Sequence, residues 1–147
     1  MNELSILIVG GGIAGLTSAI ALSQKGFTVE IIEKDPDWSV YGVGIIQQSN
    51  VVRAVDQLGI IDDYLDAGFA FDRIDVHTPD GTLVAQIPAP RLTEKYPAQL
   101  GIGRRALQKV LADSAKNHGA KIKLGVVVKN LQEDDTGVAV ELSDGTS

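Results

Sequence analysis

The chain has 147 residues, of which 44% are hydrophobic and 22% charged, a composition typical of one globular domain and unlike that of a disordered or fibrous protein. It has no cysteine, which excludes disulfides, thiolate metal sites and cysteine nucleophiles, and its net charge of −6 disfavours a nucleic-acid partner. No apolar run has the length of a membrane-spanning helix, and the first residues lack the basic segment of a secretory signal. We therefore expect a cytoplasmic protein with neither a membrane nor a nucleic-acid partner.

The N-terminal part of the chain predicts a strand–helix–strand unit. Ser5–Val9 is apolar at nearly every position, as in a strand that is buried on both faces of a parallel sheet. A helix is expected at Ile13–Lys25, and Gly26 stands where a glycine commonly ends a helix. A second strand follows at Thr28–Ile32. Such a unit has parallel strands joined by a right-handed crossover.

The middle of the chain predicts two short helices and a hairpin. After a loop at Asp35–Gly44, apolar residues at helical spacing favour helices at Ser49–Leu58 and Ile60–Ala67. The hydrophobic period then changes to two, and the turn residues Thr78–Gly81 join the arms of a β-hairpin at Ile74–Ile87.

The remaining elements complete an α/β pattern. They are a loop at Pro88–Gln99, a helix at Arg104–Asn117, strand-like segments at Ile122–Leu124, Val126–Val128 and Val138–Leu142, and a turn at Asp144–Gly145. The sequence predicts an α/β fold with a parallel sheet, helices on its faces and an antiparallel β-meander near residues 126–142. Because no return strand follows the last turn, we expect an incomplete fold. It is either the N-terminal piece of a longer protein or a domain completed by a partner strand.

The glycine-rich segment Gly10–Gly15 has the pattern G-x-G-x-x-G between the first strand and the first helix. In that context Gly10 permits the tight turn, Gly12 lets a pyrophosphate approach the backbone, and Gly15 allows close packing of helix and strand. The start of the helix offers unpaired N–H groups and a partial positive charge to the phosphates. The pattern therefore predicts a dinucleotide-binding site.

An acidic residue, Glu33, stands at the end of the second strand. A carboxylate there can accept hydrogen bonds from ribose hydroxyls and would repel a 2′-phosphate, which favours FAD or NAD over NADP. The alternative is a surface carboxylate that simply follows a strand.

Three blocks of the sequence carry a resemblance to a known family. They are Ile6–Asp35, the loop and helix from Gly42 to Gly59, and Ile102–Leu111 with its R-x-x-L-x-x-x-L pattern. The chain resembles the N-terminal portion of the FAD-dependent aromatic hydroxylases, of the p-hydroxybenzoate hydroxylase and salicylate hydroxylase types. The resemblance implies a Rossmann-like FAD/NAD(P)-binding fold over residues 1–147, in which residues 71–100 begin a substrate-side β segment. The family's downstream Gly-Asp elements and C-terminal region are not in this sequence.

The resemblance also implies a cofactor site and an activity. FAD would be bound, with NADH or NADPH as a transient reductant, and O2 would be used to hydroxylate a small aromatic substrate. Glu33 would hold the adenosine ribose, Lys34 and Val128 would lie at the adenine, and Arg104 would reach the phosphate and ribitol region. The cofactor-binding residues expected are Gly10, Gly12, Ile13, Ala14, Gly15, Glu33, Lys34, Gly44, Arg104 and Val128.

Arg104 can also be argued from its position. It shares a helical face with Leu107 and Leu111, whereas Arg105 points toward solvent. A cation at a helix N-terminus opposes the helix dipole unless a phosphate lies nearby. The alternative is an arginine that leans inward or pairs with a carboxylate. Arg53 is expected to be a solvated helical residue.

Two other functions remain open from the sequence. One is an NAD-dependent dehydrogenase domain of the same fold. The other is a non-catalytic cofactor-binding or interaction fragment, completed by a complementary chain or a second copy in a homodimer. No catalytic side chain stands out, and His77 and His118 have no neighbours at metal-ligand spacing. The acidic run 133–135 is expected to be a solvated turn.

Overall fold

The computed structural model describes residues 4–146, which form four helices and ten strands. The chain divides into two compact units: a terminal unit, Met1–Val40 with Leu111–Ser147, and a central unit, Tyr41–Val110. Helix α4 (Arg104–Asn117) begins in the central unit and ends in the terminal unit. In the part of the chain that is described, no helix has both the length and the apolar character needed to cross a membrane.

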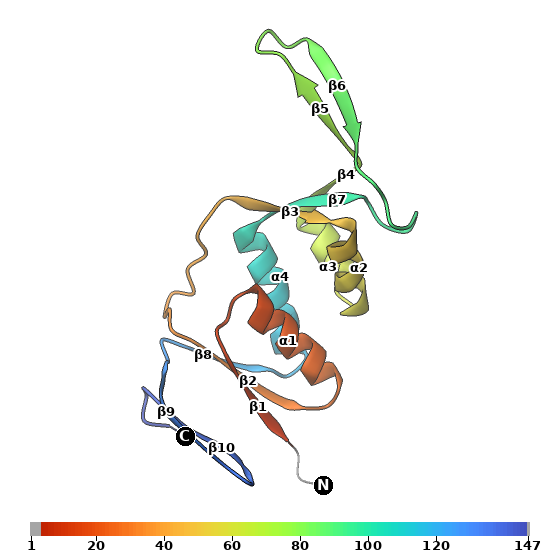
Figure 1. Ribbon diagram of the computed structural model, residues 1–147. Coiled ribbons are helices and arrows are strands. Elements are labelled where there is room, and N and C mark those ends of the chain that lie inside the picture. The colour runs from red at the N-terminus through yellow and green to blue at the C-terminus, as the bar shows by residue number, and fades with distance from the viewer. Residues whose placement is uncertain (1–3, 147) are drawn as a thin grey trace. The chain divides into compact units, whose positions relative to one another are not determined.

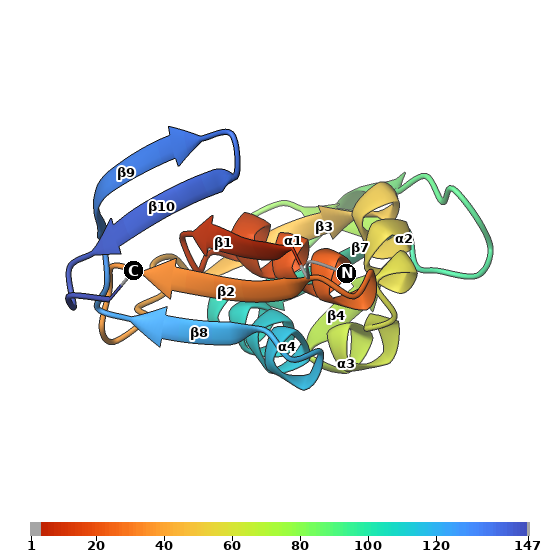
Figure 2. The same ribbon diagram turned by 90° about the horizontal axis from the view of Figure 1, so that it is seen from below.

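The terminal unit is built on a parallel sheet in the order β1-β2-β8 (Figure 2). Its strands are β1 (Ser5–Val9), β2 (Thr28–Glu33) and β8 (Lys121–Leu124), and both strand pairs are parallel. Helix α1 (Ile13–Gln24) connects β1 to β2 and packs against both strands. Its buried face consists of Leu16, Ala19 and Ile20. The predicted strand–helix–strand unit is confirmed. The first strand is not buried on both faces as expected, because β1 is at the edge of the sheet: Ile6, Leu7 and Ile8 are half-buried and Ser5 and Val9 are exposed.

An antiparallel hairpin follows the parallel sheet in the same unit. Strands β9 (Val128–Asp134) and β10 (Gly137–Leu142) pair along their length, so among the described residues the expected meander has two strands. The hairpin joins the sheet through a buried apolar cluster of Ile32, Val126 and Leu142. This cluster lies at the end of β2 and at the base of the hairpin.

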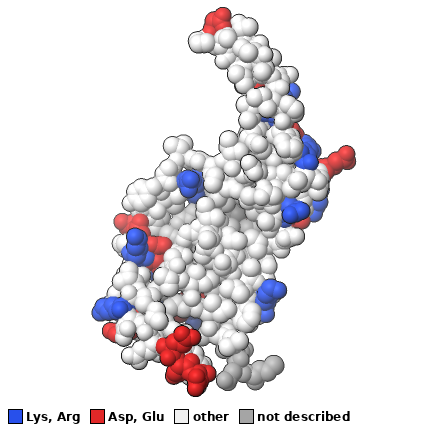
Figure 3. Space-filling model, viewed as in Figure 1, with Lys and Arg blue, Asp and Glu red and all other residues white. Residues whose placement is uncertain are grey.

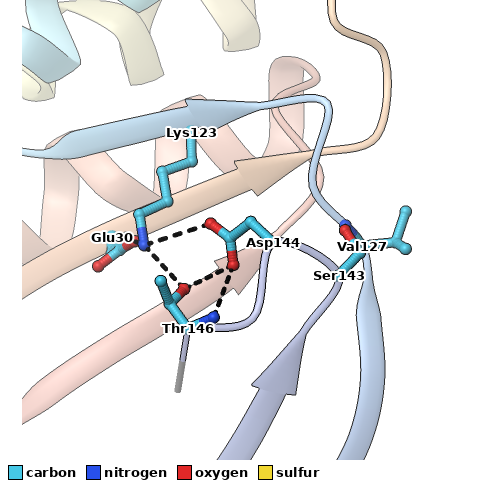
Figure 4. A network of polar contacts seen from close by, with 6 residues as sticks. All are labelled: Glu30, Lys123, Val127, Ser143, Asp144 and Thr146. Atoms are coloured by element: carbon cyan, nitrogen blue, oxygen red, sulfur yellow. Dashed lines mark hydrogen bonds and ion pairs between the residues drawn. The ribbon is translucent and has the colours of Figure 1, made fainter.

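A polar network ties the last turn of the chain to the sheet (Figure 4). Lys123 Nζ on β8 lies 3.0 Å from Glu30 Oε1 on β2, 4.0 Å from Asp144 Oδ2 and 3.3 Å from Thr146 Oγ1. The predicted turn at Asp144–Gly145 is present, with Gly145 at φ +83°. The network holds this turn against the two neighbouring strands.

The central unit contains an antiparallel sheet in the order β3-β7-β4. Its strands are β3 (Gly44–Gln48), β7 (Gln99–Gly103) and β4 (Gly68–Phe71). Helices α2 (Ser49–Gln57) and α3 (Ile61–Asp66) follow β3, as the sequence predicted within a residue or two. The core of this unit contains Val52, Tyr64 and Leu100, none of which is exposed.

The sequence does not predict this antiparallel sheet. The sequence predicts no element between the loop at Asp35–Gly44 and the helix at Ser49, none between the loop at Pro88–Gln99 and the helix at Arg104, and no strand directly after the helix at Ile60–Ala67. These strands are short and rich in glycine. Apolar and polar residues do not alternate in β3 and β4, and in β7 the alternation is confined to Leu100 and Ile102, which is too short to predict a strand. They form because each pairs with a segment far away in the sequence.

The predicted hairpin is present as β5 (Arg73–His77) and β6 (Leu83–Pro88) (Figure 1). Every residue of both strands is exposed. The turn is closed by the Gly81 N–H, which donates to the Thr78 carbonyl at 2.9 Å. The face visible in Figure 3 carries few charged residues along the hairpin and an acidic group at its tip.

Candidate dinucleotide-binding site

The glycine-rich turn joins β1 to α1 and leaves the start of the helix open. Gly10 has φ +108°, and its N–H donates to the Ile32 carbonyl at 2.7 Å, which fixes the turn to β2. Helix α1 begins without a side-chain cap, because its N-cap residue is Gly12, and no acidic residue lies in its first turn. Gly12, Ile13 and Ala14 are exposed. The free N–H groups and the positive end of the helix dipole are therefore accessible to an anion.

The three glycines of the pattern have different surroundings. A Cβ on Gly15 would lie 2.0 Å from the Gly10 carbonyl oxygen and 3.3 Å from Ile8 Cγ2, so the helix packs against the turn as closely as backbone allows. A Cβ on Gly10 or Gly12 would meet no protein atom within 4 Å. The space beside these two residues is open and could receive a phosphate group close to the backbone.

Glu33 ends β2 beside this turn. Its Oε2 accepts the Gly11 N–H at 2.8 Å, and its Oε1 accepts the Asp35 N–H at 3.0 Å. The carboxylate is half-buried and fixed in position by both bonds. Each carboxylate oxygen can accept a further hydrogen bond, so the group retains capacity for a sugar hydroxyl.

Trp38 is a part of this site that the sequence analysis missed. Its indole Nε1 donates to the Gly11 carbonyl at 2.8 Å, and Lys116 Nζ lies 5.8 Å from the ring centroid. The loop that carries it is closed by Asp35, whose carboxylate accepts the backbone N–H groups of Ser39 and Asp37. These backbone donors, that of Ser39 first, lower the pKa of Asp35 below its usual value. The only sequence signal was the presence of the chain's single tryptophan shortly after Glu33.

Arg104 is the first residue of α4 in the central unit, and its side chain lies on Gly42. A Cβ on Gly42 would be 3.1 Å from Arg104 Cδ and 3.2 Å from Nε, and Gly42 has φ +92°. Among residues 4–146, no carboxylate lies within ion-pairing distance of the Arg104 guanidinium, so the alternative of a paired arginine is not observed. Arg104 is half-buried and Arg105 is exposed, as the helical face predicted.

The other expected residues lie at strand ends. Gly44 begins β3, where a Cβ would be 3.3 Å from the Ile102 carbonyl oxygen of β7. Lys34 is exposed directly after Glu33. Val128 is half-buried at the start of β9 and packs against the cluster of Ile32, Val126 and Leu142.

The part of the chain that is described contains no group of three His, Asp or Glu side chains placed to hold a metal ion. His77 bonds to the Gly81 carbonyl and His118 to the Ser114 carbonyl, at 3.0 and 2.8 Å. Arg53 is exposed on α2, as expected. A groove of about 360 Å³ lies between the parallel sheet and the hairpin β9–β10, but no residue of the glycine-rich turn lines it.

A parallel sheet with this turn, an open helix start and an acidic residue at the end of the second strand defines a dinucleotide-binding protein. Comparison with known proteins identifies the family: residues 3–147 match the FAD binding domain family, and the chain belongs to it.

Relatives and a solved structure agree with this family. The chain is 32% identical over 143 residues to aurachin C monooxygenase/isomerase of Stigmatella aurantiaca, which covers 97% of this chain and 37% of that protein. It is 34% identical over 147 residues to rifampicin monooxygenase of Rhodococcus hoagii, covering 97% and 29%. The tetrameric form of 2-methyl-3-hydroxypyridine-5-carboxylic acid oxygenase matches with a TM-score of 0.75 at 26% identity, over 99% of this chain and 37% of that one.

The chain therefore spans well under half the length of the relatives that it matches. Their names describe monooxygenases and an oxygenase, which agrees with the resemblance to FAD-dependent hydroxylases. The alternative of an NAD-dependent dehydrogenase domain receives no support from these relatives.

Proposed function

We propose that this chain is the FAD-binding portion of a flavoprotein monooxygenase that hydroxylates an aromatic substrate with NAD(P)H and O2. The observation that carries the proposal is the open glycine-rich turn, with unpaired N–H groups at the start of α1 and the Glu33 carboxylate beside them. This arrangement fits a diphosphate ester joined to a sugar. The hydroxypyridine substrate in the name of the solved oxygenase supports the aromatic class.

The proposal gives each expected residue a task. The backbone of the glycine-rich turn binds the pyrophosphate, and Glu33 accepts a hydrogen bond from the adenosine ribose. We assign Lys34 and Val128 to the adenine, and Gly44 and Arg104 to the flavin half. The full set is Gly10, Gly12, Ile13, Ala14, Gly15, Glu33, Lys34, Gly44, Arg104 and Val128.

Bound FAD supplies the redox chemistry of such an enzyme, and the protein binds it, orients it and excludes water. That division explains why no catalytic side chain stands out in this chain. NADH or NADPH acts as a transient reductant outside the dinucleotide site. The aromatic pocket and the chemistry belong to the longer protein, so we expect this chain alone to be inactive. A cytoplasmic location fits the reaction, because NAD(P)H is supplied there.

The test is a titration of the full-length apoprotein with FAD, in which the affinity is measured from the quenching of flavin fluorescence. We expect Glu33→Gln to weaken FAD binding at least tenfold, since a hydrogen bond to a charged group contributes about 1.5–3 kcal/mol. The matched control is Glu141→Gln, the same change at an exposed residue of β10. Equal affinities of the two variants would refute the role of Glu33, and a wild-type protein that binds no flavin would refute the proposed function.

A further inference from the structure

Both peptide groups that flank the α-carbon of Gly11 are held by side chains. The Gly11 N–H donates to Glu33 Oε2, and the Gly11 carbonyl accepts the Trp38 indole N–H, each at 2.8 Å. Gly11 itself is buried, whereas Gly12 is exposed. The turn is therefore fixed from the protein side and open on the other side.

Because the peptide group is planar, the contact of the Gly11 carbonyl also determines the direction of the Gly12 N–H. In a trans peptide the C=O of one residue and the N–H of the next point in opposite directions. Because the Gly11 carbonyl points at Trp38, the N–H of Gly12 points away from Trp38. Gly12 borders the open space where an added Cβ would meet no protein atom within 4 Å. Trp38 thus sets the direction of a backbone donor at the start of α1.

Trp38 also explains why an unspecified position of the pattern is a glycine. A Cβ on Gly11 would lie 2.9 Å from Trp38 Nε1, 3.2 Å from Trp38 Cε2 and 3.2 Å from Glu33 Cβ. The middle residue of the first G-x-G is normally free to vary. In this chain it is restricted by the side chains of Trp38 and Glu33.

Trp38 is held in an unusual backbone conformation. It is the one non-glycine residue with a positive φ among residues 4–146, at +48°. Bulky residues rarely adopt this region, and they persist there only where the surrounding structure fixes them. Here the Asp35 loop fixes the backbone, and Lys116 lies over the ring.

We propose that Trp38 is a positioning residue of the dinucleotide site, which aims the Gly12 N–H at the pyrophosphate by holding the Gly11 carbonyl. This inference rests on the proposed FAD-binding function. It adds a residue that acts through the backbone of the turn and does not itself touch the phosphate.

The test uses the full-length apoprotein and two ligands, FAD and ADP, which share the pyrophosphate and the adenosine. Trp38→Phe keeps a ring and removes the indole donor. We expect Trp38→Phe to lower the affinities for FAD and for ADP by a similar factor of about 3 to 10, which corresponds to the loss of one neutral hydrogen bond. The control is Thr136→Val, which removes a side-chain hydrogen bond at the β9–β10 turn. Its affinities are expected to stay within twofold of wild type.

A rescue experiment separates positioning from general support of the fold. Gly11→Ala is expected to weaken ADP binding more than tenfold in the wild-type background, and by a clearly smaller factor in a Trp38→Leu background, where the indole is gone. Asp35→Ala, which releases the loop, provides a second variant if Trp38→Phe does not fold. Asp35→Ala is also expected to lower the affinities for FAD and ADP.

The outcomes distinguish the two proposals. A wild-type protein that binds neither FAD nor ADP would refute the proposed function and this inference with it. A wild-type protein that binds both, with Trp38→Phe and Asp35→Ala inside twofold of it, would refute the role of Trp38 alone. The same conclusion follows if Gly11→Ala costs equally in both backgrounds.

Discussion

Gly12 and Gly15 allow the same substitution to test two different reasons for a glycine. At Gly15 an added Cβ would lie 2.0 Å from the Gly10 carbonyl oxygen, and Gly10 cannot retreat easily because its N–H is bonded to the Ile32 carbonyl at 2.7 Å. Overpacking of this kind costs about 1–3 kcal/mol, and the clash with backbone puts it at the upper end. Alanine has a helix propensity about 1 kcal/mol more favourable than that of glycine, so the net loss in the free energy of unfolding is about 2 kcal/mol.

At Gly12 the same methyl group would meet no protein atom within 4 Å, and the backbone lies at φ −80°, which any residue can adopt. The free energy of unfolding should change by at most about 0.5 kcal/mol. The methyl group would, however, occupy the space that the phosphate needs, so FAD affinity should fall at least tenfold.

The assay is urea unfolding of the apoprotein followed by circular dichroism, with FAD titration of each variant beside it. Gly15→Ala should lower both the unfolding midpoint and the affinity, and Gly12→Ala should lower only the affinity. Wild-type affinity in Gly12→Ala would show that no ligand approaches the backbone there. An unchanged midpoint in Gly15→Ala would contradict the close packing of helix and turn.

Two further predictions concern the central unit. Arg104→Ala should weaken FAD binding of the apoprotein, because Arg104 is half-buried at the start of α4, whereas Arg105→Ala should leave it unchanged; equal titration curves would refute the assignment. The Tyr96 hydroxyl, and after it Lys95, lower the pKa of Asp56 below its usual 3.8. A lowered carboxyl pKa stabilises the folded state above pH 3.8, and this contribution disappears as the pH falls through the lower folded value. Below pH 3.8 the free energy of unfolding should therefore fall more steeply with decreasing pH in wild type than in Tyr96→Phe. Identical slopes of the two proteins would contradict this.

The parts of the fold that the sequence predicted are those with local signals. The strand Ser5–Val9 is apolar at every position after Ser5, and Gly26 adopts φ +85° where a helix end was expected. The sheet β3-β7-β4 escaped prediction because its order comes from pairing between distant segments. Gly44 lies opposite Gly103, and neither glycine carries a side chain whose period could reveal a strand. The structure of this sheet is therefore determined by tertiary pairing, because local sequence preferences do not indicate its strands.

The candidate site divides in the same way. The spacing of the glycines and of Glu33 was visible in the sequence, because each acts through its own type and position. The role of Trp38 was not visible in the sequence. Its contact with Gly11 depends on the turn made by Asp35 and on a positive φ, which no sequence pattern predicts. Glu33 likewise has a task that its position did not predict, the hydrogen bond to the Gly11 N–H.

The two tasks of Glu33 determine what its substitution measures. Glutamine can still accept the Gly11 N–H through its amide oxygen, but its amide nitrogen cannot accept the Asp35 N–H, which now bonds to Oε1 at 3.0 Å. Glu33→Gln therefore loosens the loop that carries Trp38 as well as the contact with a sugar. A binding site whose donors are fixed before the ligand arrives loses less entropy on binding, so both effects lower affinity in the same direction. They separate in a double-mutant cycle with Trp38→Phe, because only the loop contribution is shared by the two residues.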